Sequence, residues 1–318
     1  GSGGIATMNR AAMYGAKAAV IEAGYLGGTC VNLGCVPKKI MWYGSQIAEA
    51  IQNYGPEYGF TSQEVTFDFS TLRKNREAYI ERSRISYGNT FNKNGVEVIN
   101  GFARFVDNQT VEVNGELIRA KHIVIATGAR PDVPSIPGSE LGIVSDDVFA
   151  WEELPSSVAV LGAGYIAVEM AGLFHGLGVQ TDLFVRGNRS LRRFDTYIVE
   201  ALMEEMNRTD LPLPTGKTSI SLEKTQDGHI QIHFEDGSSH VAQQVLWAIG
   251  RKPNVDKLNL EATGVQLTPA GHIAVNEVQE TGISGIYALG DVTGEKELTP
   301  VAIKAGRLLA ELLFNNKP

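Results

Sequence analysis

Residues 158–167 have the sequence Val-Ala-Val-Leu-Gly-Ala-Gly-Tyr-Ile-Ala, in which four apolar residues precede a glycine-rich turn. A helical pattern follows through His175, and a second strand-like run, Thr-Asp-Leu-Phe-Val, follows at 181–185. In such a unit the first glycine permits a tight turn, the second lets the backbone approach a pyrophosphate, and the final alanine permits close helix packing. Because the Gly-x-Gly-x-x-Ala pattern lies between a strand and a helix, it predicts a dinucleotide-binding α/β unit.

Arginines rather than a carboxylate follow the second strand of this unit. Arg186 comes directly after the strand, and Arg192 lies further along, with Arg189 and Arg193 nearby. An acidic residue at the strand end suits the ribose of NADH, whereas cations suit the 2′-phosphate of NADPH. The pattern therefore favours NADPH, and a solvated basic turn is the alternative interpretation.

The chain has two cysteines, Cys30 and Cys35, in the segment Gly-Gly-Thr-Cys-Val-Asn-Leu-Gly-Cys-Val-Pro-Lys-Lys at 27–39. A disulfide requires Cα atoms roughly 4.4–6.8 Å apart, so this spacing needs a tight turn, and Gly34 gives that turn backbone freedom. We interpret the cysteines as a redox pair. Two unrelated buried thiols or half a metal site are the alternatives, but no metal is expected because no other cysteine or nearby histidine completes a ligand set.

A helix is expected directly after the cysteine segment. Pro37 suits the first turn of a helix, and the apolar residues that follow recur at helical spacing. Cys35 would then lie near a helix N-terminus, where the helix dipole favours the thiolate that acts as nucleophile in disulfide exchange. The apolar stripe of this helix consists of Ile40, Tyr43, Gly44, Ile47, Ala48 and Ile51.

Three further segments have features of nucleotide sites. A glycine-rich start at 1–4 leads into a helical pattern, and Glu22 follows about twenty residues on, where such units bind an adenosine ribose. A glycine-rich solvent loop would look similar. Two other strand-like runs end in Ala126-Thr127-Gly128 and in Gly290-Asp291. A carboxylate such as Asp291 at a strand end can bind a ribityl hydroxyl, although either segment could be an ordinary strand terminus.

Composition and charge limit the classes of function. The chain has 318 residues, 43% of them hydrophobic and 20% charged, as expected for a globular protein with two domains. A net charge of −8 without Lys/Arg runs argues against nucleic acid as a partner. The longest apolar runs are too short to cross a membrane. So few cysteines fit a reducing compartment, and we expect the cytoplasm.

The ordered motifs identify a family resemblance. With the cysteine segment, two dinucleotide units, Ala126-Thr127-Gly128 and Gly290-Asp291 in this order, the chain resembles the flavin-dependent pyridine nucleotide-disulfide oxidoreductases over essentially all its residues. It is most similar to the members that reduce glutathione disulfide. Lipoamide dehydrogenases usually have serine before the lysine that occupies position 38 here, and they place an acidic residue where this chain has arginines.

The resemblance implies a mechanism with FAD and NADPH as cofactors. Hydride would pass from NADPH to the flavin, with Tyr165 as an aromatic gate over the nicotinamide pocket. Lys38 would lie near the flavin N5 and pair with Glu169, and its ammonium would stabilise negative charge on the reduced flavin. Cys35 would be the thiol facing the flavin, and Cys30 the interchange thiol that attacks glutathione disulfide.

The resemblance also implies binding residues. Ser2, Tyr87 and Arg307 match positions that contact glutathione, and an arginine can bind a carboxylate through two hydrogen bonds. The residues expected to bind FAD or NADPH are Ser2, Gly3, Glu22, Thr29, Lys38, Ala126, Thr127, Gly128, Gly162, Gly164, Tyr165, Ile166, Glu169, Arg186, Arg192, Gly250, Asp291, Leu298 and Thr299. For each of them an ordinary packing or surface role is the alternative.

The implied fold is α/β, with two Rossmann-like nucleotide-binding domains that have parallel sheets. We expect an FAD domain at 1–129, an NADPH domain at 130–253 and a return to the FAD side at 254–318. The stretch 96–116, with turns at Asp107-Asn108 and Asn114-Gly115, predicts a small antiparallel β excursion.

The chain departs from the family pattern in three places. The family's general acid is a histidine paired with a glutamate in a C-terminal dimerisation domain, and none of the six histidines here lies in such a motif. No strand precedes the first glycines. We therefore expect a fragment of a homodimeric enzyme, nearly inactive by itself. Gly187 also stands where some relatives have a histidine, which weakens the NADPH assignment slightly. A reductase of another low-molecular-weight disulfide and a non-catalytic nucleotide-binding module are the competing interpretations.

Overall fold

The computed structural model describes residues 1–61 and 66–315. The chain divides into two compact units. Unit 1 consists of Gly1–Asn32, Tyr79–Arg130 and Lys252–Pro318, and unit 2 of Leu33–Ala78 and Pro131–Arg251. Each unit is formed by segments that are distant in sequence, and each has its own hydrophobic clusters.

The main sheet of unit 2 has four parallel strands in the order β10–β9–β14–β8. These strands are β8 (Ile143–Val144), β9 (Ser157–Leu161), β10 (Gln180–Phe184) and β14 (Gln244–Trp247). Helix α7 (Tyr165–Gly176) connects β9 to β10, as parallel neighbours require. The strand–turn–helix–strand unit predicted from the glycine motif is therefore confirmed.

Strand β9 is buried on both faces, which explains its continuous apolar sequence. Val158 and Val160 pack into a cluster with α7, whereas Ala159 and Leu161 pack toward a three-stranded antiparallel sheet. That sheet consists of β11 (Ser219–Lys224), β12 (Ile230–Phe234) and β13 (Ser239–Ala242). The glycine turn that follows β9 thus begins from a strand fixed by packing on both sides.

Helix α3 (Cys35–Glu49) confirms the helix predicted after the cysteines, with Pro37 in its first turn. Its buried face is formed by Met41 and Ser45, whereas Tyr43 and Ile47 of the apolar stripe are 55% and 60% exposed. The stripe therefore does not coincide with the buried face. The remaining helices of unit 2 are the π-helical turn η1 (Ala50–Tyr54), α4 (Gly55–Glu57), η2 (Ser139–Leu141), α6 (Ser145–Val148) and α8 (Thr196–Arg208).

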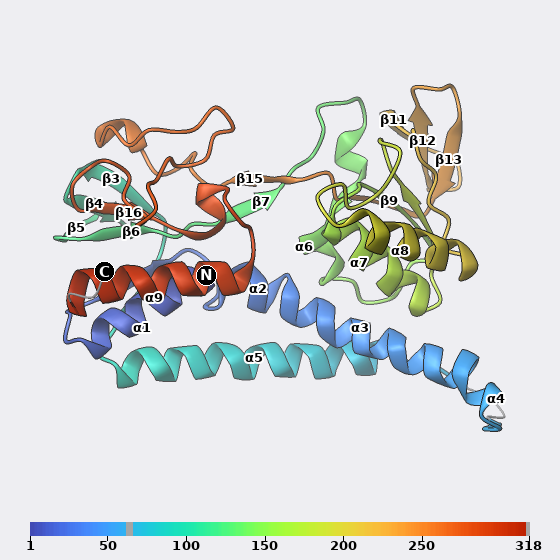
Figure 1. Ribbon diagram of the computed structural model, residues 1–318, viewed down its shortest axis with the longest axis horizontal. Helices are drawn as coiled ribbons and strands as arrows, with labels where there is room; N and C mark the ends of the chain where they lie inside the picture. The colour runs from blue at the N-terminus through green and yellow to red at the C-terminus, as the bar shows by residue number, and fades with distance from the viewer. Residues whose placement is uncertain (62–65, 316–318) are drawn as a thin grey trace. The chain divides into compact units, whose positions relative to one another are not determined.

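Unit 1 contains two pairs of parallel strands. Strand β1 (Ala19–Glu22) pairs with β2 (Glu97–Asn100), and β6 (Ile123–Ile125) pairs with β16 (Ile286–Ala288). Helices α1 (Ser2–Met13) and α9 (Thr299–Asn315) lie side by side (Figure 1). Gly306 permits this close approach, because a Cβ there would lie 2.6 Å from the Gly3 carbonyl oxygen.

The predicted antiparallel excursion is present with different bounds. It is formed by β3 (Ala103–Asp107), β4 (Thr110–Val113) and β5 (Glu116–Arg119). The preceding strand β2 pairs in parallel with β1 instead, because helix α5 (Phe69–Lys93) returns the chain so that β2 runs beside β1 in the same direction. The other elements are α2 (Gly28–Asn32), β7 (Ala129–Pro131) paired with β15 (Arg251–Pro253), η3 (Leu260–Ala262) and η4 (Gly290–Thr293).

Candidate active site

The glycine turn of unit 2 has the shape required for a dinucleotide pyrophosphate. A Cβ at Gly162 would lie 2.2 Å from the Ala248 carbonyl oxygen, so a larger residue there would displace the backbone. Gly164 is the N-cap of α7, and no atom lies within 4 Å of where its Cβ would be. Ala167 is fully buried. The space beside Gly164 is therefore open at the start of α7, and the first amides of a helix are donors that a phosphate can use.

Lys38 and Glu169 form the ion pair that the family resemblance implies. The Lys38 Nζ lies 2.5 Å from the Glu169 Oε2, and the two side chains are 24% and 43% exposed. Lys38 is on α3, three residues after Cys35, and Glu169 is on α7, four residues after Tyr165. The pair thus joins the first turns of two helices, one beginning at a cysteine and the other at the glycine turn.

Each cysteine has a distinct local setting. Cys35 is exposed and is the first residue of α3, so the expected position at a helix N-terminus is confirmed. A helix N-terminus favours negative charge, and Lys38 follows one turn later on the same helix. Cys30 is half-buried on the short helix α2.

Helix α2 is held by a residue pair that sequence reasoning missed. The buried Asn32 donates from its amide to the carbonyl of Gly28 at 2.9 Å, and also to the carbonyls of Tyr25 and Leu26. Its amide oxygen accepts from the Arg84 Nε at 2.7 Å, and the Arg84 guanidinium lies 3.8 Å from the centre of the Tyr25 ring. The asparagine between the cysteines was the available signal, because a polar residue in that apolar segment needs partners.

Tyr87 lies close enough to Cys30 for their charges to interact. Burial raises the pKa of the Tyr87 phenol, and the charge of the Cys30 thiolate raises it further. Tyr87 is on α5 and packs against the cluster of Ile5, Phe91 and Val96 in unit 1. The phenol therefore stays protonated at neutral pH and can donate a hydrogen bond beside Cys30.

Two predicted cofactor segments meet at one edge of a sheet in unit 1. Because β6 and β16 are parallel neighbours, Ala126-Thr127-Gly128 and Gly290-Asp291 follow them at the same carboxyl end. The Thr127 hydroxyl donates to the Asn254 carbonyl at 2.8 Å. Gly128 has φ +70°, a conformation that favours glycine. The edge where ligands of parallel sheets collect therefore holds Asp291 beside this turn.

The other predicted residues occupy scattered positions. Ser2 and Gly3 begin α1, and the Glu22 carboxylate at the end of β1 accepts from the Gly24 amide at 3.0 Å. Thr299 begins α9, which also contains Arg307. Within residues 1–61 and 66–315, no hydrogen bond or ion pair joins Arg307 to Tyr87 or Ser2. Of the remaining predicted residues, Thr29 lies on α2, Ile166 on α7 and Leu298 just before α9. Gly250 follows β14, and its carbonyl accepts from the Asp132 amide.

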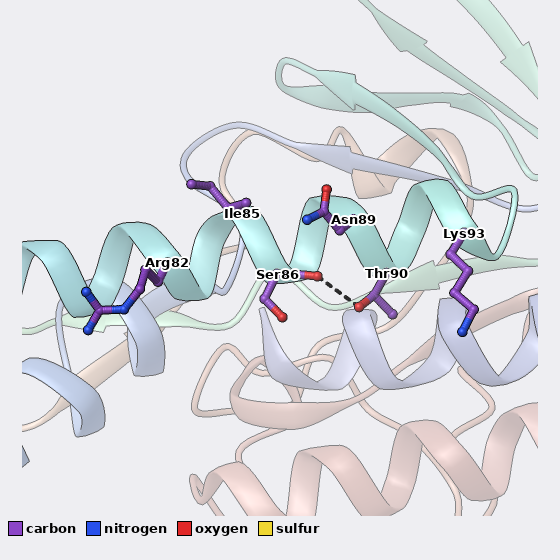
Figure 2. A pocket seen from close by; sticks show the side chains of 6 residues that line it. All are labelled: Arg82, Ile85, Ser86, Asn89, Thr90 and Lys93. Carbon is purple, nitrogen blue, oxygen red and sulfur yellow. Dashed lines mark hydrogen bonds between the residues drawn. The ribbon is translucent and has the colours of Figure 1, made fainter.

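The surface has two hollows that are not lined by the predicted site residues. One of ≈ 330 Å³ follows a face of α5 and is lined by Arg82, Ile85, Ser86, Asn89, Thr90 and Lys93 (Figure 2). Its walls come from one helix, so it does not enclose a ligand. Another of ≈ 460 Å³ lies at the start of β10, the opposite end of the strand from the arginines. Neither matches a predicted site residue.

The described residues contain neither a metal-binding cluster nor a membrane-spanning helix. No group of three or more His, Cys, Asp or Glu side chains in the described residues is arranged to hold a metal ion. None of the helices in residues 1–61 and 66–315 has the length and apolar character needed to cross a membrane.

Comparisons with known proteins agree with this geometry. The family model described as pyridine nucleotide-disulphide oxidoreductase matches residues 1–306. The glutathione reductase of Schizosaccharomyces pombe is 44% identical, over 99% of this chain and 70% of that protein. The glutathione reductase of Yarrowia lipolytica is 42% identical over the same shares. A match over nearly the whole chain, with the glycine turn and the Lys38–Glu169 pair formed, shows that this chain belongs to the pyridine nucleotide-disulphide oxidoreductase family.

Proposed function

We propose that this protein reduces glutathione disulfide to glutathione with electrons from NADPH. The observation that supports this most directly is Cys35 at the first position of α3, one turn before Lys38, whose ammonium is paired with Glu169 behind the glycine turn. This arrangement places a thiol, a cation and a dinucleotide turn on two packed helices. Two relatives that align with 99% of the chain, at 44% and 42% identity, are glutathione reductases.

The cofactors of this protein are FAD and NADPH. FAD, when bound, supplies the two-electron chemistry that connects a nicotinamide to a disulfide. The residues of this chain fit both groups: the open space at Gly164 suits the NADPH pyrophosphate, and the β6–β16 edge with Asp291 suits the flavin ribityl chain. Lys38 would hold positive charge at the flavin, and Tyr165, 38% exposed at the start of α7, would cover the nicotinamide pocket.

The two cysteines perform the exchange with the substrate. The Cys30 thiolate attacks one sulfur of glutathione disulfide, forms a mixed disulfide and releases one glutathione thiolate. The Cys35 thiolate then attacks the Cys30 sulfur, which forms the Cys30–Cys35 disulfide and releases the second glutathione thiolate. Each released thiolate takes one proton. Two electrons derived from NADPH return the pair to the dithiol, so one NADPH is consumed per glutathione disulfide.

The substrate would be held by residues of unit 1. Tyr87 stays protonated and lies near Cys30, so its hydroxyl can orient glutathione at the attacking sulfur. Ser2, at the start of α1, would bind a polar group of glutathione. Arg307, which is exposed on α9, would bind a carboxylate of glutathione.

Thiol counting tests this function without requiring sustained turnover. The purified chain with FAD should show flavin absorbance, and one equivalent of NADPH should produce two titratable thiols per chain. One equivalent of glutathione disulfide should then remove both thiols and yield two glutathione molecules. If NADPH produces no thiols, the redox pair is wrong. If another low-molecular-weight disulfide reoxidises the thiols tenfold faster, the substrate assignment is wrong.

We further infer that the protein acts as a homodimer in the cytoplasm. The outward face of α3 presents Trp42, Tyr43 and Ile47, which are 40%, 55% and 60% exposed. Exposed apolar groups clustered on one helix favour a protein–protein contact. The cytoplasmic location follows from a redox pair that must be kept cycling and from the absence of other cysteines in the sequence.

Light scattering on the native protein tests the dimer. Replacing Ile47 with Asp should lower the measured mass toward that of one chain, because a charge on this face would have to be buried in the contact. The matched control is Gln46→Asp on the same helix turn, an exposed polar position outside the apolar cluster. Equal masses for both variants would exclude the outward face of α3 as the contact.

A further inference from the structure

The segment between β10 and α8 contains four arginines with different environments. The side chains of Arg186 and Arg192 are exposed, and within the described residues no side-chain hydrogen bond or ion pair of theirs is formed. Arg189 is half-buried, and its guanidinium is used inside the loop. Its Nη1 donates to the Thr196 hydroxyl at 2.8 Å, and its Nη2 donates to the Arg192 carbonyl at 3.2 Å.

The partners of Arg189 are neutral oxygens, so the positive charge of the loop is not cancelled. The nearest acid in the sequence, Asp195, is the N-cap of α8 and accepts from the amides of Tyr197 and Ile198 at 3.0 and 3.4 Å. In the part of the chain that the structure describes, the ion pairs do not include Arg189 or Arg192. The loop therefore keeps its cations available for an anionic ligand.

The same loop is fixed to the glycine turn by its backbone. The Leu191 amide donates to the Ala163 carbonyl at 2.7 Å, and Ala163 lies between the two glycines of the turn. Leu191 has φ +45°, a left-handed conformation that is unfavourable for a residue with a side chain and must be held by its surroundings. The Gly187 carbonyl also accepts from the Gly216 amide at 3.0 Å. Backbone hydrogen bonds thus hold residues 187 and 191 in place. The two hydrogen bonds of the Arg189 guanidinium connect the Arg192 carbonyl to Thr196 at the start of α8.

We propose that Arg189 is a positioning residue for recognition of the 2′-phosphate. By joining the Arg192 carbonyl to the Thr196 hydroxyl, it holds the backbone from which the Arg192 side chain projects beside the glycine turn. The planar guanidinium suits this role because it donates to two acceptors in a fixed geometry, which a lysine ammonium does not do. This inference rests on the proposed use of NADPH, with Arg186 and Arg192 as the phosphate ligands.

The test measures selectivity for the 2′-phosphate in the full chain by isothermal titration with 2′,5′-ADP and 5′-ADP. The readout is the dissociation constant of 5′-ADP divided by that of 2′,5′-ADP, a ratio that measures preference for the 2′-phosphate. A general loss of folding weakens both ligands and does not change this ratio selectively. Arg192→Gln, which removes a proposed ligand, should lower this ratio at least about tenfold. Arg189→Gln and Thr196→Val should each lower it roughly three- to tenfold, with the double variant no worse than either single one, because both remove the same brace.

Two control variants separate positioning from charge. Thr196→Ser keeps the accepting hydroxyl and should preserve the ratio within about twofold, and Arg193→Gln, which removes a neighbouring exposed charge, should do the same. If Arg189→Gln changes the ratio but Thr196→Val does not, Arg189 is itself a phosphate ligand and the positioning role is wrong. If Arg189→Gln matches Arg193→Gln, Arg189 has no role. If Arg192→Gln has no effect, the 2′-phosphate assignment fails and this inference fails with it.

Discussion

At Cys35 two local features act on one thiol. The residue begins α3, whose dipole favours negative charge at its N-terminus, and the Lys38 ammonium lies on the same helix one turn later. Cys30, in contrast, lies on the short helix α2 beside the protonated Tyr87. The two cysteines are therefore placed in different electrostatic settings, which suits the different roles proposed for them.

Serine variants should separate the two thiols. Cys30→Ser should leave bleaching of the flavin by NADPH intact but abolish consumption of glutathione disulfide, because Cys30 is the attacking group. Cys35→Ser should abolish consumption and also remove the long-wavelength absorbance expected of a thiolate beside the flavin. Stopped-flow spectra of both variants decide the assignment, and exchanged results would reverse the roles. Near-normal turnover of Cys30→Ser would rule out the redox pair.

The Lys38–Glu169 pair should matter more for chemistry than for stability. Both side chains are partly exposed, and such pairs contribute about 0–1 kcal/mol to folding. Lys38→Met should therefore lower the unfolding free energy by less than about 1 kcal/mol, while the rate of flavin bleaching by NADPH falls roughly 10²-fold, because a charge placed at the reacting group is lost. The control is Lys39→Met, an exposed neighbour, whose rate should be unchanged. Equal rates for the two variants would contradict the proposed role of Lys38.

Helices α3 and α7 come close enough for that pair because the residues between them are small. Gly176 ends α7, and a Cβ there would lie 2.8 Å from the Ser45 Cβ on α3. Met41, on the same buried face of α3, contacts the guanidinium of the fully buried Arg76, which donates to the Phe149 carbonyl at 2.6 Å. Small residues therefore bring α3 close to α7, and Arg76 connects the buried face of α3 to the Phe149 backbone.

A pair of glycine substitutions on α7 tests this packing. Gly176→Ala should destabilise the protein by about 1–3 kcal/mol, because the new methyl group overlaps Ser45 and forces α3 outward. Gly172→Ala is the matched control on the same helix, since no atom lies within 4 Å of its Cβ position. Alanine there should stabilise by about 0.5–1 kcal/mol through helix propensity. Chemical denaturation measures both, and equal effects would show that the α3–α7 contact is not close.

The limits of sequence reasoning are also visible in particular elements. The β9–α7–β10 unit was predictable because its glycine spacing and strand periodicity are local. Helix α5 was not, because its sequence is mostly polar and its 25 residues show no clean apolar stripe. The pairing of β2 with β1 depends on that helix, so the start of the antiparallel excursion was misplaced. Asn32 was missed for a similar reason, since its partner Arg84 lies 52 residues away in the sequence.

At the scale of the whole molecule, the sites are divided between two units. The glycine turn, the arginine loop and the Lys38–Glu169 pair lie in unit 2, whereas Cys30, Tyr87 and the β6–β16 edge lie in unit 1. The boundary between the units falls between Asn32 and Leu33, within the cysteine segment itself. The residues proposed to bind the NADPH phosphates thus all belong to unit 2, whereas Cys30 and Tyr87 belong to unit 1.

Hydrogen exchange with and without 2′,5′-ADP should reveal this division. A ligand present at one hundred times its dissociation constant stabilises the fold to which it binds by about 2.7 kcal/mol. If the units open separately, slowly exchanging amides of β9, α7 and β14 should gain this protection, whereas those of β3 and β4 in unit 1 should change little. Arg192→Gln provides the control, because the protection should shrink with the affinity for the phosphate. Equal protection of β9 and β4 would mean that the two units unfold as one cooperative body, and Cys30 would then be stabilised by a ligand that contacts only unit 2.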